Sequence, residues 1–314
     1  MMILSAALIA LLFASFMIGT FPIMPKAVWD ILLSKLIPRE AYWEPVMERV
    51  VLQVRLPRIL LAILVGGALS VSGASYQTLF KNPMVSPVLL GVSAGAGFGA
   101  ALVMLHGDPW WQVQASAFAF GIAAVVAAWI IGRIFGQQNI TVLVLAGVVV
   151  SSLFQSLLSI VKTLADTEDA LPSITFWLMG SLGKVSLAVL FFFRHQIDAL
   201  AAGEEEAAAM GVNVGAVKIA VVSASTLMTV SAVSICGIVG WVGMVVPHIA
   251  RLLVGASYQK LSAASLLIGG FFLLMIDNII RGIGAGTLPL GVLTSLVGTP
   301  VFVVLLTQAR KAWN

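Results

Sequence analysis

The feature that most limits how this chain can fold is a series of apolar stretches, each about as long as a bilayer is thick. A transmembrane helix needs about 20 mostly apolar residues, and many segments of the sequence meet that requirement. They are Met2–Phe21, Ile59–Leu79, Val88–Leu105, Val113–Phe135, Thr141–Val161, Val217–Cys236, Ile238–Leu253, Ser262–Ile280 and Leu290–Thr307. The sequence therefore predicts an all-α, polytopic membrane protein, with one membrane domain over residues 1–314 and no soluble domain.

Composition leads to the same class of protein. The 314 residues are 60% hydrophobic and only 10% charged, whereas about a quarter of the residues of a soluble domain are charged. So few charges do not cover the surface of a water-soluble particle. The first stretch, Met2–Phe21, has no basic start, so we expect a retained helix rather than a cleaved signal peptide.

One further stretch, Ile174–Phe193, is a doubtful span. Lys184 lies near its middle, and a charge at that depth in hydrocarbon is costly. The segment that follows, Leu187–Phe193, is too short to cross before Arg194. Either the stretch is irregular, or residues of a helix are missing from the sequence between Gly183 and Arg194. With this stretch we expect about ten transmembrane helices.

The loops do not settle the orientation. The longest connection runs from Ile23 to Arg58, and within it Ala27–Leu36 fits a short interfacial helix. Cytoplasmic loops usually carry an excess of Lys and Arg. With ten spans and both ends inside, the basic residues divide almost evenly between the two sides.

Ionisable groups inside the predicted spans are scarce. Asp277 is the only carboxylate in a well-predicted span, and Arg281 follows one helical turn later on the same face. Two interpretations stay open, a structural ion pair near the helix end and a proton or ion site. Proton-driven transporters relay protons through buried Asp, Glu or His, so this scarcity indicates that the energy for any transport comes from elsewhere.

The sequence lacks the usual marks of an enzyme or of a resident cofactor. No Gly-x-x-x-x-Gly-Lys-Ser/Thr nucleotide motif is present. The histidines, His106, His195 and His248, lie far apart and have no partner at metal-ligand spacing. Cys236 is the only cysteine, which excludes a disulfide within the chain and favours a packed hydrophobe. We therefore expect no catalysis, no metal and no cofactor in this chain, and no nucleic-acid partner.

Small residues mark two helix faces. Gly91, Gly95 and Gly99 are four residues apart, a spacing that lets helix backbones approach closely. A polar stripe recurs at helical spacing farther along the chain. It consists of Ser151, Ser152, Gln155, Ser156 and Ser159. Such a stripe forms either interhelical hydrogen bonds or the water-facing wall of a translocation path.

An acidic, alanine-rich segment, Ala201–Val212, interrupts the apolar pattern. Its glutamates would occupy the first turn of a short helix, where they complement the helix dipole, and Gly211 suits the C-terminal cap. A free helix of this length is marginal in water. We interpret the segment as a docking element for another protein, with a solvated loop as the alternative.

Several motifs along the chain resemble one family, the permeases of type II ATP-binding-cassette importers for iron-siderophores, haem and cobalamin. They cover nearly the whole chain in order. The stretches are Arg55–Arg58, Gly66–Gly73 with Gln77, Asn82–Pro87 with Gly91, Trp177–Leu182, Gly203–Glu205 with Ala207 and Met210–Val212, Gly237–Gly243 with Pro247, His248 and Arg251, Asp277 with Arg281, and Leu288–Gly291 with Gly298–Pro300.

The resemblance implies a cobalamin-importer-permease-like fold and a set of partners. These are a second copy of the chain, two cytoplasmic ATPase subunits that hold ATP and Mg, a substrate-binding protein outside the membrane, and lipid. It implies a bacterial inner-membrane location with both termini in the cytoplasm. The ATPase-coupling residues would be Gly203, Glu204, Glu205, Ala207, Ala208, Met210 and Gly211.

The resemblance also implies roles at the two membrane faces. Arg55, Arg58 and Arg281 would meet the binding protein outside. Pro247, His248 and Arg251 lie near the predicted inner end, where a gate and an ordinary helix end are both open interpretations. The cargo would be a metal chelate or a metal oxyanion such as molybdate. The competing functions are an ion-gradient-driven secondary transporter and a membrane receptor that does not transport.

Overall fold

The computed structural model describes the chain except for residues 36, 38–40, 81, 83–84, 137–139, 183–213, 256, 285–287 and 312–314. The described part contains helices and no strand. The elements are α1 (Met2–Ser15), α2 (Pro25–Ser34), α3 (Pro45–Arg49), the π-helical turn η1 (Val50–Arg55), α4 (Leu56–Leu79), the 3₁₀ turn η2 (Pro87–Leu90), α5 (Val92–Met104), α6 (Trp110–Gly136), α7 (Ile140–Leu164), α8 (Ala170–Leu178), α12 (Val214–Cys236), α13 (Val242–Val254), α14 (Tyr258–Gly282) and α15 (Leu290–Lys311).

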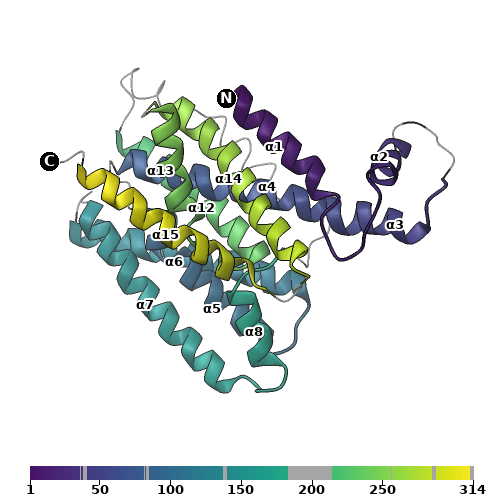
Figure 1. The fold of residues 1–314 in the computed structure, drawn as a ribbon. Helices are drawn as coiled ribbons and strands as arrows, with labels where there is room; N and C mark the ends of the chain where they lie inside the picture. Colours follow the sequence, from purple (N-terminus) through teal and green to yellow (C-terminus); the bar gives the residue numbers. More distant parts are fainter. Residues whose placement is uncertain are drawn as a thin grey trace.

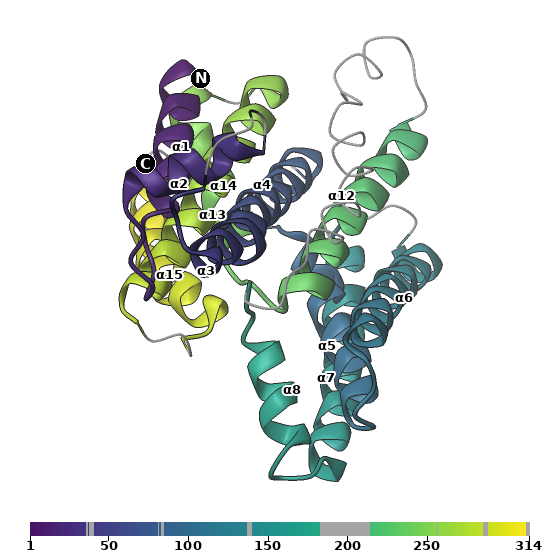
Figure 2. The same cartoon turned by 90° about the vertical axis from the view of Figure 1, so that its right-hand side faces the viewer.

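The helices form two groups that meet at the centre of the molecule (Figures 1 and 2). One group contains α1 to α4 with α13 to α15, and the other contains α5 to α8 with α12. Helix α4 packs against α14, α13 and α12 and joins the two groups. Most of its residues are buried, which explains why this helix is apolar all round rather than on one stripe.

Glycines allow the helices around α4 to approach closely. A Cβ atom added to Gly66 would lie 2.1 Å from the carbonyl oxygen of Gly269 in α14, and one on Gly73 would lie 1.7 Å from the carbonyl oxygen of Gly243 in α13. Small residues at such crossings are typical of helix packing in membranes, where lipid gives no hydrophobic drive between helices.

The predicted glycine face of α5 is confirmed at two positions. Cβ atoms on Gly95 and Gly99 would lie 2.4 Å and 2.5 Å from the carbonyl oxygens of Phe120 and Ser116 in α6. Gly91 instead precedes the helix with φ +90°, where a side chain would be strained.

Each of the well-predicted spans coincides with a helix, although several are shorter than expected. Helices Pro45–Leu79, Trp110–Phe135, Thr141–Leu164 and Tyr258–Gly282 are long and apolar enough to cross a bilayer, and shorter apolar helices such as α1, α5 and α13 accompany them. The expected total of about ten spans stays a prediction.

The doubtful span Ile174–Phe193 does not begin as one continuous helix, and its residues 183–193 lie outside the described part of the chain. Helix α8 ends at Leu178, because the chain turns at Gly180 with φ +78°. At about 1.5 Å per residue, α8 is too short to cross a membrane. The possible omission between Gly183 and Arg194 lies outside the described residues.

The long helix that begins at α3 is longer than a membrane core is thick. Residues Pro45–Leu79 are helical without a break and span about 52 Å at 1.5 Å per residue, against a hydrocarbon core of about 30 Å. Helix α2 packs against η1, in the first part of this long helix. The start of α1 and the end of α15 point away from α2 and α3, toward the other end of the bundle, and lie apart from each other there (Figure 1).

Candidate functional site

Three chain segments meet at the junction of the two helix groups. They are the turn after α8, the loop between α12 and α13, and the start of α15. Backbone hydrogen bonds join them directly. The amide of Leu290 donates to the carbonyl of Gly180 (3.0 Å), that of Gly291 to Met179 (2.8 Å), and that of Ser181 to Cys236 (2.6 Å).

Glycines make this junction possible. Gly180 and Gly237 have φ values of +78° and +75°, which disfavour any other residue. A Cβ atom on Gly237 would lie 2.1 Å from the carbonyl oxygen of Trp177, and one on Gly291 would lie 2.6 Å from that of Met179. The glycine-containing motifs of the sequence thus mark the places where three backbones touch.

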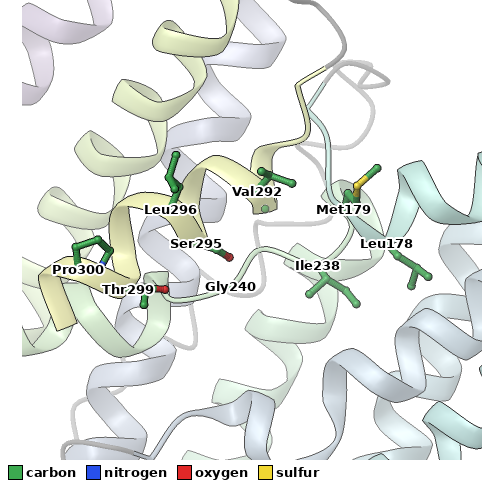
Figure 3. Close-up of a pocket in the computed structure, with 10 residues that line it drawn as sticks. Leu178, Met179, Ile238, Gly240, Val292, Ser295, Leu296, Thr299 and Pro300 are labelled. Atoms are coloured by element: carbon green, nitrogen blue, oxygen red, sulfur yellow. The ribbon is translucent and has the colours of Figure 1, made fainter. Parts of the chain in front are cut away.

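An open pocket of about 730 Å³ lies against this junction, between α8 and α15 (Figure 3). Its wall is mainly apolar, and the hydroxyls of Ser295 and Thr299 supply polar atoms. None of the lining residues is ionisable. They are Leu178, Met179, Ile238, Gly240, Gly291, Val292, Ser295, Leu296, Thr299 and Pro300.

Gly240, at one edge of the pocket, is followed by a residue with a strained backbone, Trp241. Trp241, which precedes α13, has φ +69°, and this left-handed conformation costs a non-glycine residue about 1–2 kcal/mol. Its ring lies 5.5 Å from that of Phe302 in α15, between centroids, and Gly298 leaves room beside its Cβ atom. Contacts between α13 and α15 thus hold the loop at Gly240 in place.

The predicted polar stripe lies on α7 and faces away from the rest of the described chain. Ser152, Gln155, Ser156 and Ser159 are exposed, and Ser151 is partly buried beside Gly91. The exposed serines donate to carbonyls of their own helix at 2.9 Å, as from Ser156 to Ser152. The stripe therefore makes no hydrogen bond to another helix of the described chain. Its role as the wall of a translocation path stays a prediction.

A charged cluster lies at the end of the bundle near α2. The predicted pair of Asp277 and Arg281 is confirmed, with Oδ2 and Nε 2.9 Å apart. A third member, Arg58, was not predicted as part of this cluster, and its Nε lies 2.8 Å from Asp277 Oδ1. Asp277 is fully buried, and two guanidinium groups neutralise it, so we interpret it as structural.

Two of the predicted docking arginines contact the C-terminal end of α1. Arg281 donates to the carbonyls of Ser15 (2.9 Å) and Ile18 (3.0 Å). Arg55, which is 4% exposed, donates to the carbonyls of Phe16 and Phe21. The last carbonyls of a helix have no partner within the helix and carry its negative dipole end, so both cations stabilise the end of α1.

Arg58 differs from its two neighbours. Its side chain is 23% exposed, against 9% for Arg281, and its hydrogen bond within the described chain goes to the carboxylate of Asp277 rather than to a backbone carbonyl. All three arginines line a second pocket of about 250 Å³. Arg58 is thus the arginine whose guanidinium is most accessible from outside the protein.

The candidate inner-gate residues lie on α13 at the other end of the bundle. Pro247 is buried inside the helix, and because it has no N–H it leaves the carbonyl of Gly243 free at the contact with Gly73. His248 is partly buried, and Nε and Nη2 of Arg251 are buried without a hydrogen-bond partner among the described residues. Helix α14 runs from this end to Arg281 and is about 35 Å long at 1.5 Å per residue, enough to cross a hydrocarbon core of about 30 Å.

The predicted ATPase-coupling residues, Gly203, Glu204, Glu205, Ala207, Ala208, Met210 and Gly211, lie outside the described residues. In the part of the chain that is described, no three side chains among His, Cys, Asp and Glu come together as metal ligands.

Comparisons with known proteins agree closely with this geometry. The profile of the FecCD transport family matches residues 7–308. The molybdate import system permease protein MolB of Haemophilus influenzae is 34% identical over 308 residues, which are 94% of this chain and 91% of that protein. A probable iron chelatin transport system permease protein of Helicobacter pylori is 36% identical over 83% of both chains. A solved inward-facing ABC transporter of the metal-chelate type superposes with a TM-score of 0.83, at 32% identity and over 97% of both chains.

Proposed function

This chain belongs to the FecCD transport family, and from that membership we infer how it works as the membrane-spanning permease subunit of an ATP-binding-cassette importer. The observation that carries the mechanism is the pocket between α8 and α15. No side chain in its wall is ionisable, and the buried carboxylate of Asp277 is already paired with two arginines. The described helices thus offer a passage but no proton relay, so the energy is supplied by a partner that hydrolyses ATP.

Two copies of the chain form the path. The exposed serines of α7, the pocket between α8 and α15, and the exposed side chains of α15 such as Leu296 all lack a covering element in one subunit. A second copy facing this surface would enclose a path lined by hydroxyl and apolar groups. The serine hydroxyls are bonded to their own helix, so they offer a passing solute acceptor atoms but little tight binding.

The cargo is a metal chelate or a metal oxyanion such as molybdate, the two kinds of solute for which the relatives are named. A wall without charge holds neither class strongly, since it has no cation for an oxyanion and no ligand for a metal. We therefore assign selection of the cargo to the external binding protein and passage to this chain.

The docking site for that binding protein lies at the arginine end of the bundle, and Arg58 is its main contact. A carboxylate from the partner can exchange with Asp277 at the accessible guanidinium of Arg58. Arg55 and Arg281 act as positioning residues, because their N–H groups hold the end of α1. The sequence-based expectation was that all three arginines meet the binding protein, and we now propose that contact mainly for Arg58.

The opposite end of the bundle faces the cytoplasm in this scheme, with both termini there. We assign docking on the ATPase to the segment around Glu204 and Glu205, on the basis of its sequence. Replacing both glutamates with Lys is expected to weaken co-purification of the ATPase while the permease still inserts in the membrane. Unchanged co-purification and unchanged transport would exclude this segment as the docking element.

The test of the function is uptake by reconstituted vesicles. We expect accumulation of molybdate or of an iron chelate only when ATP, the ATPase subunit and the loaded binding protein are all present. Uptake driven by an ion gradient in vesicles without the ATPase would instead indicate a secondary transporter. Binding without uptake under every condition would indicate a receptor.

For the docking site, the variants Arg58→Ala and Arg55→Ala separate the two roles. Arg58→Ala is expected to weaken binding-protein affinity and also to lower the melting temperature, because it removes one of the two cations paired with the buried Asp277. Arg55→Ala is expected to lower the melting temperature, because it leaves carbonyls at the end of α1 without donors. Equal loss of affinity in both variants would contradict the division of roles.

A further inference from the structure

Helix α2 is held rigidly at the arginine end of the bundle. Its inner face, formed by Ala27, Val28 and Ile31, is buried. The hydroxyl of Tyr42 donates to Asp30 Oδ2 at 2.8 Å, and Lys35 pairs with Glu48 at 2.6 Å. These contacts connect the middle and the C-terminal end of α2 to the segment around α3 and set the direction of its outer face.

The outer face of α2 is apolar and uncovered by the described chain. Trp29 is 50% exposed, and Met24, just before the helix, is 77% exposed. An exposed tryptophan on a rigid helix is unusual on a surface that contacts only water, since burying such a ring contributes substantially to stability.

The neighbour of Trp29 shows at what depth this face lies. The ring centroids of Trp29 and Phe13 are 5.7 Å apart. Phe13 belongs to α1 and is exposed in line with Ile9 and Met17, four residues before and after it. This row is the outward face of a membrane helix, so Phe13 faces lipid near the end of α1, and Trp29 continues the same apolar surface.

The polar groups beside Trp29 fit the boundary of the bilayer. Lys26, one turn earlier, is exposed, and its Nζ lies 5.6 Å from the ring centroid of Tyr42. Tryptophan and tyrosine concentrate where the hydrocarbon meets the headgroups, and lysine side chains there extend toward the phosphates.

We propose that α2 is a lipid-anchoring helix, with Trp29 and Met24 inserted among the phospholipids at this face of the membrane and Lys26 at the level of the phosphates. Its partner is the bilayer surface rather than a protein. Because α2 packs on η1, the anchor holds the start of the long helix at a set height, close to Arg55. The proposal requires that the chain is a membrane protein and does not depend on its cargo or its ATPase.

Spin labelling tests the depth of this face in nanodiscs of phosphatidylcholine. The variant Cys236→Ala removes the only cysteine, and single cysteines are then placed at Trp29, at Phe13 as a lipid reference, and at Glu44 as an exposed reference on the same module. We expect the label at position 29 to collide several times more often with oxygen than with a water-soluble nickel chelate, as at position 13. The label at position 44 should show the reverse.

A ratio at position 29 equal to that at position 44 would overturn the proposal. So would a label at position 29 that becomes immobile only when the binding protein is added, because that result would make this face a protein-docking surface. Labels on both reference positions confirm that the background variant is folded.

A second measurement leaves the native tryptophan in place. Brominated phospholipids quench tryptophan emission on contact, and the chain has 8 tryptophans, so the emission is compared between the unmodified protein and Trp29→Phe. Lipids can carry bromine close to the headgroup. We expect Trp29→Phe to lose the part of the tryptophan emission that such lipids quench in the unmodified protein. Identical fractional quenching in both proteins would place Trp29 outside the bilayer.

Discussion

The contact between Gly73 and Gly243 gives a sharp test of how the helices are packed. A Cβ atom on Gly73 would lie 1.7 Å from the carbonyl oxygen of Gly243, whereas real Cβ contacts essentially never fall below 3.0 Å. The variant Gly73→Ala therefore forces α4 and α13 apart by 1.3 Å or more. Both contacting atoms belong to the backbone or are fixed to it, so no side-chain rotation relieves the clash.

The expected loss of stability is about 3 kcal/mol, the upper end of the usual cost of overpacking. The unfolding entropy is about 2.1 cal/mol/K per residue, so for 314 residues 1 kcal/mol shifts the melting temperature by about 1.5 °C. Gly73→Ala should therefore melt roughly 5 °C below the unmodified protein. Because α13 begins at the edge of the pocket, we also expect reduced uptake of cargo.

The matched control is Gly240→Ala. The nearest atom to a Cβ atom there is Ser295 Oγ at 3.6 Å, an ordinary contact, so this variant should melt close to the unmodified protein. The assay is thermal unfolding of the detergent-solubilised protein, followed by size-exclusion chromatography. A melting temperature of Gly73→Ala equal to that of the control would refute the close approach of α4 and α13.

Three more outcomes follow from the same structure. Asp277→Asn leaves two guanidinium groups without a carboxylate. Because breaking a buried pair costs about 3–5 kcal/mol, the melting temperature of this variant should fall strongly. An unchanged melting temperature would show that the cluster is solvated. Ser156→Ala should change stability by about 0.5 kcal/mol or less, because the hydroxyl is bonded only to its own helix, and a large loss would mean that it has an interhelical partner. Cys236 is 2% exposed, so a maleimide should label it only after denaturation, and rapid labelling of the native protein would contradict its burial.

The sequence predicts the helices well because lipid imposes a minimum length of apolar chain on each span. It predicts the ends of helices poorly, since those depend on distant partners. Helix α1 was expected to reach Phe21 but ends at Ser15, where Arg55 and Arg281 take up its last carbonyls. Nothing in the local sequence around Ser15 identifies those arginines as donors.

The candidate site shows the same division between local and distant information. The pair of Asp277 and Arg281 could be predicted from helical spacing, whereas Arg58 lies 219 residues before Asp277 in the chain. The pocket needs three segments that no single motif describes. The positive φ of Trp241 was also unexpected, because only the contacts around it stabilise that conformation. The glycine motifs gave the one usable signal, since residues without a Cβ atom mark places where backbones meet.

The ion pair between α4 and α14 has a consequence for how the protein is made. Ribosomes add about 5–20 residues per second, so Arg58 leaves the ribosome roughly 10–40 s before Asp277, which lies 219 residues later. During that interval its charge has no carboxylate to meet and must stay with water or headgroups at the membrane surface. The ion pair between α4 and α14 therefore forms only after Asp277 has been synthesised, which makes the joining of these two helices through it a late step of biogenesis.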